Sequence, residues 1–266
     1  MSAKKILRFT LAEAKTTGKV IIYPCGVVDV QASTSPMFGM SGWEKAEDYA
    51  HPKPLPLAGE KHGRKCIDPQ GEDTERAMRR ARGKLRRIAL SNSFRWFVTL
   101  TIDPSKVDSH DGAAVVKKLN AWCSNMVQRK GLCYLLVPER HKKGGIHFHG
   151  FFNDCVEAVD SGHKDRQGHT IYNLPQWSLG FTTAIELYDD YQKAVAYVCK
   201  YIGKQGEKPA GRWYYSGGNL QEPQVEYCDL SSRELLEQYG QRAYEVQLPG
   251  KQLVIINGLG GDDFGL

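Results

Sequence analysis

Two histidines that are one residue apart carry the clearest sign of chemistry in this sequence of 266 residues. His147 and His149 lie on either side of Phe148 in an apolar segment with strand composition. Because side chains alternate between the two faces of a strand, both imidazoles point the same way while Phe148 enters the core. Together with Glu139 in the preceding strand, they predict a mixed nitrogen and oxygen site for Mn²⁺ or Mg²⁺. A purely structural histidine pair is the alternative.

This metal site depends on the register between the strand that carries Glu139 and the strand that carries the histidines. Glu139 points to their side only if its cross-strand partner is His147 or His149 rather than Phe148. That pairing requires an odd number of residues in the connection between the two strands. It would also place His141 on the same face, as a reserve ligand.

A later helical segment carries two tyrosines and two lysines. Tyr197 and Tyr201 are four residues apart, and Lys200 and Lys204 each follow a tyrosine by three, so all four share one side of a helix. A phenol with a pKa of about 10 is a weak nucleophile at neutral pH and needs a polarised electrophile and a nearby cation. The metal site and the lysines supply both, which predicts catalysis by a tyrosine. An amphipathic helix with packed tyrosines and solvated lysines is the alternative.

A basic segment precedes these motifs. Residues 72–90 begin with acids and become strongly basic, which is the charge order that a helix dipole favours. Cations that neutralise phosphates release condensed counterions, so this density favours nucleic acid contact over a merely solvated helix face. The net charge of +6 is too small to decide this alone. The residues predicted to contact DNA are Arg79, Arg80, Arg82, Arg86, Arg87 and, later in the chain, Lys204.

The elements around these residues predict an α+β fold, in which one antiparallel five-stranded sheet has the helices packed on it. Residues 154–178 are polar and are expected to form a loop. We expect an N-terminal extension and connector at 1–70, the main domain at 71–220, and a C-terminal helix and strand extension at 221–266. Strands are expected at 19–24, 26–31, 94–103, 132–138, 145–152, 182–187, 212–216 and 247–256, and helices at 72–90, 113–130, 191–204 and from Leu230 onward.

Three short motifs occur in a fixed order: Phe97-Val-Thr-Leu-Thr101, His147-Phe-His149 and Tyr197-Val-Cys-Lys-Tyr201. In this order they resemble the motifs of HUH endonucleases, in particular the initiators of rolling-circle replication in single-stranded DNA phages and related plasmids. The resemblance covers roughly residues 79–216 and implies a ferredoxin-like or RRM-like sheet with the histidines on a central strand. It also implies that the first motif is scaffold beside the site.

The resemblance implies a role for each site residue. His147 and His149 would bind the metal, with Glu139 as the acidic third ligand. Tyr197 would attack a DNA phosphate and keep the 5′ end as a phosphotyrosine, which leaves a free 3′-OH for a polymerase. Tyr201 would be the second tyrosine, used when the replicated circle is closed. Lys200 and Lys204 would each stand beside one tyrosine, with Lys200 steadying the phosphate.

The partners implied are single-stranded or hairpin origin DNA, a DNA polymerase and a helicase of the host, because the chain has no GxxxxGK[ST] phosphate loop. An apolar run of about 18 residues is absent, so no membrane-spanning helix is expected. The first residues lack the pattern of a secretory signal, which predicts the cytoplasm, that of a bacterial host. The seven cysteines are scattered without a CxxC pair, which argues against a zinc ribbon or a disulfide framework.

Two other functions stay open at this point. An HUH-type transposase would share the same motif order. A non-catalytic single-stranded DNA-binding module on the same fold would show no metal dependence. A relaxase is disfavoured, because relaxases place the tyrosine near the N-terminus and use three histidines.

Overall fold

The computed structural model describes residues 15–39, 72–187, 191–202, 204 and 207–260. The chain forms two compact units, of which unit 1 comprises residues 1–67 and 224–266 and unit 2 comprises residues 68–223. Most of the connector expected before residue 71 lies outside the described residues. Within the described residues, no helix has the length and apolar character needed to cross a membrane.

Unit 2 is built on a seven-stranded antiparallel sheet in the order β6-β7-β8-β3-β5-β4-β9. The central strand β3 alternates strictly, with Val98 and Leu100 buried and Thr99 and Thr101 half-buried on the other face. This alternation follows from the two-residue period of a strand. The strands are β3 (Trp96–Ile102), β4 (Tyr134–Arg140), β5 (Ile146–Phe152), β6 (Val159–Lys164), β7 (Thr170–Asn173), β8 (Gly180–Glu186) and β9 (Tyr215–Gly217).

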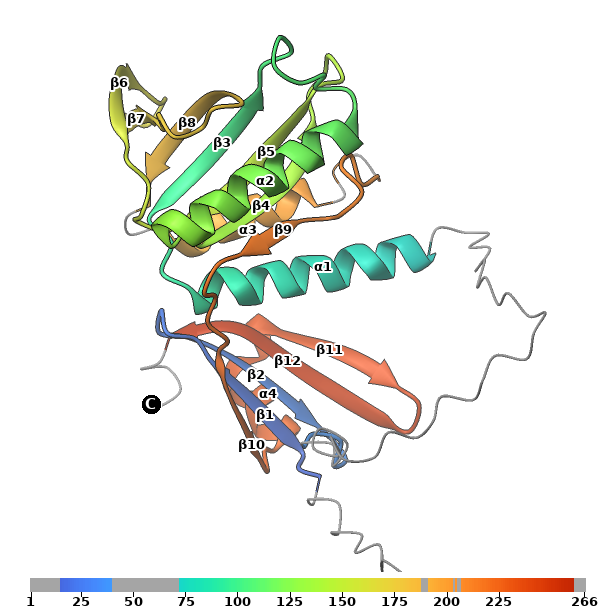
Figure 1. Cartoon of the computed structure of the whole chain (residues 1–266). Coiled ribbons are helices and arrows are strands. Elements are labelled where there is room, and N and C mark those ends of the chain that lie inside the picture. The colour runs from blue at the N-terminus through green and yellow to red at the C-terminus, as the bar shows by residue number, and fades with distance from the viewer. Residues whose placement is uncertain (1–14, 40–71, 188–190, 203, 205–206, 261–266) are drawn as a thin grey trace, which may run out of the picture. The chain divides into compact units, whose positions relative to one another are not determined.

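The apolar face of this sheet packs against helix α2 (Gly112–Lys130), which lies across β3, β5 and β4 in Figure 1. Asp111 begins the helix, since its side chain accepts hydrogen bonds from two backbone amides of the first turn. Gly131 ends it in a left-handed conformation with φ 70°, which only glycine adopts freely. The stripe of Val115, Leu119, Trp122, Cys123 and Met126 fills the core between helix and sheet.

The half-buried face of the sheet carries helix α3 (Tyr191–Tyr201), which contacts β4 and β5. Helix α1 (Glu72–Ser91) packs against α3 and buries Leu85 and Ala89. Both helices were expected from the sequence, and α3 ends three residues earlier than predicted. The helices of unit 2 therefore cover both faces of its sheet.

The expected single five-stranded sheet with helices packed on it is wrong. The described residues form two large antiparallel sheets, of seven and five strands, with only four α-helices. Residues 154–178 contain the hairpin of β6 and β7 where a loop was expected. This hairpin lies at the edge of the sheet, and five of the six residues of β6 are exposed, so it lacks the alternating apolar pattern on which strand prediction depends.

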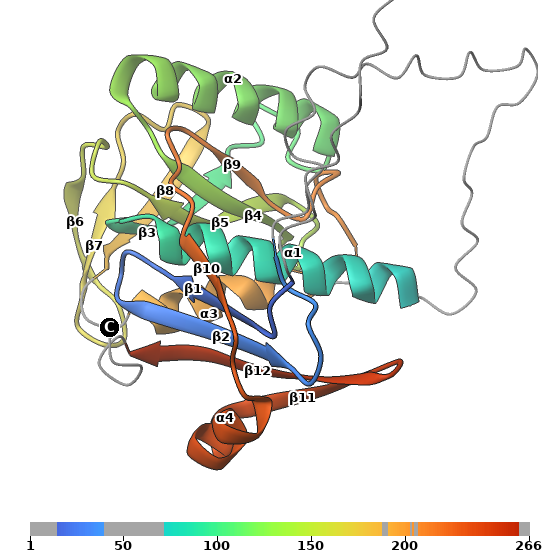
Figure 2. The same ribbon diagram turned by 90° about the horizontal axis from the view of Figure 1, so that it is seen from below.

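Unit 1 contains the second sheet, in the order β10-β1-β2-β12-β11. Val30, Ala32, Val254 and Ile256 form its fully buried centre, and helix α4 adds Leu235 to this core (Figure 2). The strands at 19–24, 26–31 and 247–256 and the helix after Leu230 were expected, but their assembly into one sheet was not. Its elements are β1 (Gly18–Ile22), β2 (Val27–Ser33), β10 (Gln224–Cys228), α4 (Ser232–Tyr239), the short 3-10 helix Gly240–Arg242, β11 (Ala243–Leu248) and β12 (Lys251–Gly260).

Candidate functional site

The register between β4 and β5 places Glu139 directly opposite His147. The backbone amide of His141 donates to the Gly145 carbonyl at 2.8 Å, so three residues close the turn. This odd number is the condition set out in the sequence analysis, and the register prediction is confirmed. Glu139 therefore shares a sheet face with His147 and His149, while Phe148 is fully buried on the opposite face.

Two threonines of β3 hold the histidine rings from the neighbouring strand. Thr99 Oγ1 lies 3.1 Å from His149 Nδ1, and Thr101 Oγ1 lies 3.4 Å from His147 Nδ1. Each threonine is the cross-strand partner of the histidine that it contacts. A hydroxyl both donates and accepts, so either tautomer of the ring is satisfied and Nε2 stays available to a ligand. The sequence analysis treated these threonines as scaffold, although their spacing of two matches that of the histidines.

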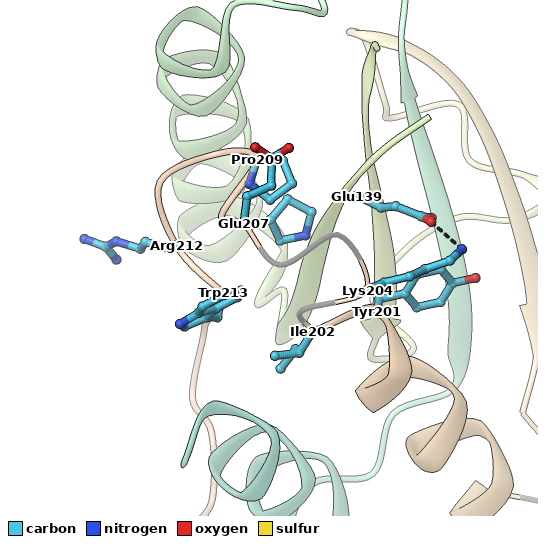
Figure 3. A pocket seen from close by; sticks show the side chains of 9 residues that line it. Glu139, Tyr201, Ile202, Lys204, Glu207, Pro209, Arg212 and Trp213 are labelled. Atoms are coloured by element: carbon cyan, nitrogen blue, oxygen red, sulfur yellow. Dashed lines mark hydrogen bonds and ion pairs between the residues drawn. The ribbon is translucent and has the colours of Figure 1, made fainter. Parts of the chain in front are cut away.

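Glu139 is the centre of the charged contacts at this face. Its Oε2 lies 3.0 Å from His149 Nε2, and its Oε1 accepts a hydrogen bond from Lys204 Nζ at 2.6 Å. The Glu139 side chain is only 15% exposed, so water screens these contacts weakly. In Figure 3, Lys204 reaches from the end of α3 toward this carboxylate. The same contact raises the pKa of Lys204, because the carboxylate favours the charged ammonium.

Burial keeps both imidazoles neutral near pH 7. It lowers the pKa of His149 to about 4, although Glu139 opposes this shift. Burial also lowers the pKa of His147, and the neighbouring His141 adds to the effect. Neutral imidazole is the form that binds a metal ion.

The donor chemistry of this face fits a divalent cation. Two neutral imidazoles and a carboxylate are ligands that Mn²⁺ accepts, and the threonines supply the supporting contacts that metal-binding histidines need. Within the described residues, however, no three His, Cys, Asp or Glu side chains are gathered closely enough to hold an ion. The ring of His147 stacks on His141 instead, with centroids 5.2 Å apart. Of the predicted ligands, His149 and Glu139 are therefore in contact, and His147 lies beside them on the same face.

The two tyrosines of α3 lie over the same histidine. The ring of Tyr201 stacks on His149, and its hydroxyl donates to the Tyr197 hydroxyl at 2.7 Å. Tyr197 packs its ring edge against Phe97 of β3 and is 48% exposed. Burial and this hydrogen bond raise the pKa of Tyr201, since both disfavour its phenolate.

The two lysines of the helix differ in their contacts. Lys204 lies 5.4 Å from the Tyr201 ring centroid in addition to its contact with Glu139. Lys200 is exposed and makes no hydrogen bond or ion pair within the described residues. The structure thus brings Lys204, and not Lys200, into the cluster. A small cavity beside the cluster has Glu139, Tyr201 and Lys204 on its wall, together with Trp213 (Figure 3).

The basic helix α1 supports α3. The guanidinium of Arg82 donates two hydrogen bonds, at 3.2 and 2.7 Å, to the carbonyl of Ile202 directly after the last residue of α3. Arg87 pairs with Glu222 at 3.1 Å, whereas Arg79 and Arg80 are exposed and free of such contacts within the described residues. Arg82 therefore has a structural contact that its sequence pattern did not predict.

Comparison with known families bears on the part of unit 2 that contains these residues. Residues 95–206 match the model of a replication-associated protein family of the ORF2 type. The match covers less than half of the chain and includes both histidines, Glu139 and both tyrosines. It indicates a role in replication initiation with DNA as a partner, and it is consistent with a rolling-circle replication initiator. Comparisons with curated proteins and with solved structures found no significant match.

Proposed function

We propose that the protein is a site-specific enzyme that nicks and joins single-stranded DNA and thereby initiates rolling-circle replication through a 5′-phosphotyrosine. The observation that carries the proposal is the stacking of Tyr201 on His149, with Tyr197 hydrogen-bonded to Tyr201. This contact brings the two predicted motifs, the histidine pair and the tyrosine helix, to one place.

Tyr197 is the proposed nucleophile. Its hydroxyl accepts the hydrogen bond from Tyr201, so a developing phenolate on Tyr197 has a donor in place. Tyr197 is also the more exposed of the two rings and can meet a DNA strand. Its oxygen forms a bond to phosphorus, the bond from phosphorus to the 3′ oxygen breaks, and the phenolic proton leaves to solvent while the 3′ oxygen gains one.

Glu139, His147 and His149 are the residues that would hold a divalent metal, Mn²⁺ or Mg²⁺. When bound, such an ion neutralises charge on the non-bridging oxygens of the scissile phosphate and orients it. Thr99 and Thr101 keep the imidazoles aimed by contacting their Nδ1 atoms. Lys204 holds the Glu139 carboxylate in the absence of the ion and supplies a positive charge next to Tyr201.

Tyr201 is the proposed second nucleophile, used when the displaced strand is rejoined. A phosphotyrosine ester keeps the energy of the broken phosphodiester bond, so rejoining requires no ATP. Lys200 and the exposed arginines Arg79 and Arg80 would contact phosphates of the bound strand. A separate host helicase would open the duplex, and a host polymerase would extend the 3′-OH.

Covalent attachment to DNA tests this proposal. The full chain is incubated with a pool of 3′-labelled single-stranded oligonucleotides, with Mn²⁺ or with EDTA, and protein-linked label is read on a denaturing gel. We expect an adduct with Mn²⁺ only. Tyr197→Phe should reduce it at least 100-fold, and Tyr197→Phe with Tyr201→Phe should abolish it. Tyr244→Phe, at an exposed tyrosine of unit 1, is the matched control. An adduct formed by the double variant would refute the nucleophile assignment.

The non-catalytic binding module is the second candidate, because no three ligand side chains are gathered within the described residues. It predicts that the chain binds the same oligonucleotides equally well with Mn²⁺ and with EDTA. It also predicts that His147→Ala leaves binding unchanged and that no adduct forms under any condition.

A further inference from the structure

Phe181 is the most exposed large apolar side chain of unit 2 among the described residues, at 68%. It is the second residue of β8, a strand that pairs with β3 along its whole length, and so it is held in regular sheet structure and not in a loop. Full burial of such a side chain contributes about 1.5–3 kcal/mol, so its exposure forgoes a substantial stabilisation. No ring within the described residues contacts it.

Phe181 lies on the same sheet face as the candidate site. Its cross-strand partner is Thr101, and Thr101 is also the partner of His147 on the other side of β3. Directly opposed residues point to the same face, and the contact between Thr101 Oγ1 and His147 Nδ1 fixes which face this is. Phe181 and His147 are therefore two strands apart in one row, at a backbone separation on the order of 10 Å.

The backbone at this position is tightly held. A Cβ added at Gly180 would overlap the carbonyl oxygen of Thr101, which means that β8 approaches β3 as closely as two strands can. The Asp103 amide donates to the Leu179 carbonyl at 2.9 Å and continues the pairing just before β8. The phenyl ring is thus presented from a fixed backbone, with only its own two torsions free.

The surroundings of Phe181 favour a nucleic acid base over a protein partner. Its neighbours on this face, Thr101, Thr183 and His147, are polar and half-buried or exposed. A docking site for protein is a contiguous apolar patch, which a single ring among polar residues does not make. A flat aromatic ring beside hydroxyl and imidazole groups is instead what unpaired bases stack on next to their phosphates.

We propose that Phe181 stacks on an unpaired base of the bound DNA strand and so sets where that strand lies relative to the histidines. This inference rests on the proposed function for its ligand, single-stranded DNA. A separation of about 10 Å corresponds to about three nucleotides of a stacked strand, so the stacked base lies within about three nucleotides of the attacked phosphate. Phe181 is then a binding residue that contributes to the choice of nicking position.

The first test measures binding without chemistry. Fluorescence anisotropy in EDTA gives the affinity of the full chain for a single-stranded oligonucleotide selected by adduct formation. Phe181→Leu keeps an apolar side chain but removes the stacking surface, and we expect affinity to fall about 5- to 150-fold. Phe181→Trp should retain the affinity of the original chain. Tyr244→Leu, at the similarly exposed aromatic of β11 in unit 1, should have no effect.

The second test locates the base. Oligonucleotides with 2-aminopurine at successive positions report stacking by loss of fluorescence on binding. We expect strong quenching at one position within about three nucleotides of the nick, and loss of this quenching in Phe181→Leu. Unchanged affinity in Phe181→Leu would overturn the inference, as would a change in sedimentation without a change in DNA binding, which would mean a protein partner. Failure of the nucleophile assignment appears separately, in the adduct assay.

Discussion

The ring of Tyr201 lies flat on the imidazole of His149, with ring centroids 4.1 Å apart and planes 8° from parallel. His149 belongs to the central part of the sheet and Tyr201 to the last turn of α3, so this stacking joins the two elements. It leaves Tyr197, one turn earlier, more exposed and hydrogen-bonded to the Tyr201 hydroxyl. The two tyrosines are therefore not equivalent, and this asymmetry underlies the order of nucleophiles proposed above.

Glu139→Gln should separate the carboxylate from its two charged contacts. The amide keeps the shape of the side chain but loses the charge that holds Lys204 and faces His149. We expect adduct formation to fall about 100-fold, because outer contacts of a metal site contribute 10–100-fold and a ligand contributes more. Glu207→Gln, at an exposed ion pair with Arg140 beside the same cavity, is the matched control and should retain activity. Full activity of Glu139→Gln would exclude Glu139 as a ligand.

Thr99→Val tests the contact that orients His149. Valine has the shape of threonine without the hydroxyl that meets Nδ1 at 3.1 Å. The Mn²⁺ concentration for half-maximal adduct formation should rise about 10- to 100-fold. Thr183→Val is the control, because Thr183 is the cross-strand partner of Thr99 on the same face and contacts no histidine. Equal Mn²⁺ requirements in the two variants would contradict the role of Thr99.

Arg82 and Arg80 should respond differently to the same substitution. Arg82→Gln removes two hydrogen bonds to the Ile202 carbonyl, and we expect a loss of about 1 kcal/mol, or about 2–4 °C in Tm. Arg80→Gln should leave Tm unchanged but lower the slope of log Kd against log salt by about 0.7, as the loss of one phosphate contact does. Thermal melting and salt titrations measure the two effects. The assignment fails if the two variants behave alike.

Alkaline pH should destabilise unit 2 through a buried thiol. Burial raises the pKa of Cys123 to about 12 from an ordinary value of 9.0. The unfolded chain then releases this proton at lower pH than the folded chain, so stability is complete below pH 9 and falls above it, by up to about 1.4 kcal/mol per pH unit. Tryptophan fluorescence in urea at pH 8, 9 and 10 measures this slope. Cys123→Ala should flatten it, whereas Cys25→Ala, at an exposed thiol, should not.

Two glycines should respond to alanine in opposite directions. A Cβ at Gly150 in β5 would overlap the Leu135 carbonyl oxygen in β4, so Gly150→Ala should cost several kcal/mol or prevent folding. A Cβ at Gly83 in α1 meets nothing, and Gly83→Ala should stabilise the helix by about 0.5–1 kcal/mol. Urea denaturation of both variants compares these effects. A stable Gly150→Ala variant would mean that β4 and β5 are not as close as described.

The part of the site that depends on strand periodicity could be predicted from the sequence. A period of two residues fixes that His147 and His149 share a face, and an odd turn then fixes that Glu139 joins them. The same reasoning extends to Thr99 and Thr101, but only after β3 is known to lie next to β5. Neighbouring strands are not given by local pattern, so these contacts required the structure.

Other features left no local pattern at all. The contact of Arg82 with Ile202 depends on how α1 packs against α3, and an arginine in a basic helix looks the same whether it meets a carbonyl or a phosphate. The sheet of unit 1 joins strands from both ends of the chain, and no periodicity records which distant strand will be a partner. The polar hairpin of β6 and β7 buries neither face well enough to show alternation.

The sheet of unit 1 takes β1 and β2 from before unit 2 and its other three strands from after it, whereas residues 68–223 are continuous. On the ribosome, every strand of the larger sheet therefore emerges before β10 has been synthesised. The nascent β1–β2 hairpin waits with both edges open until translation supplies β10 for one and β12 for the other. Completion of the smaller sheet is thus a late event, coupled to the release of the finished polypeptide.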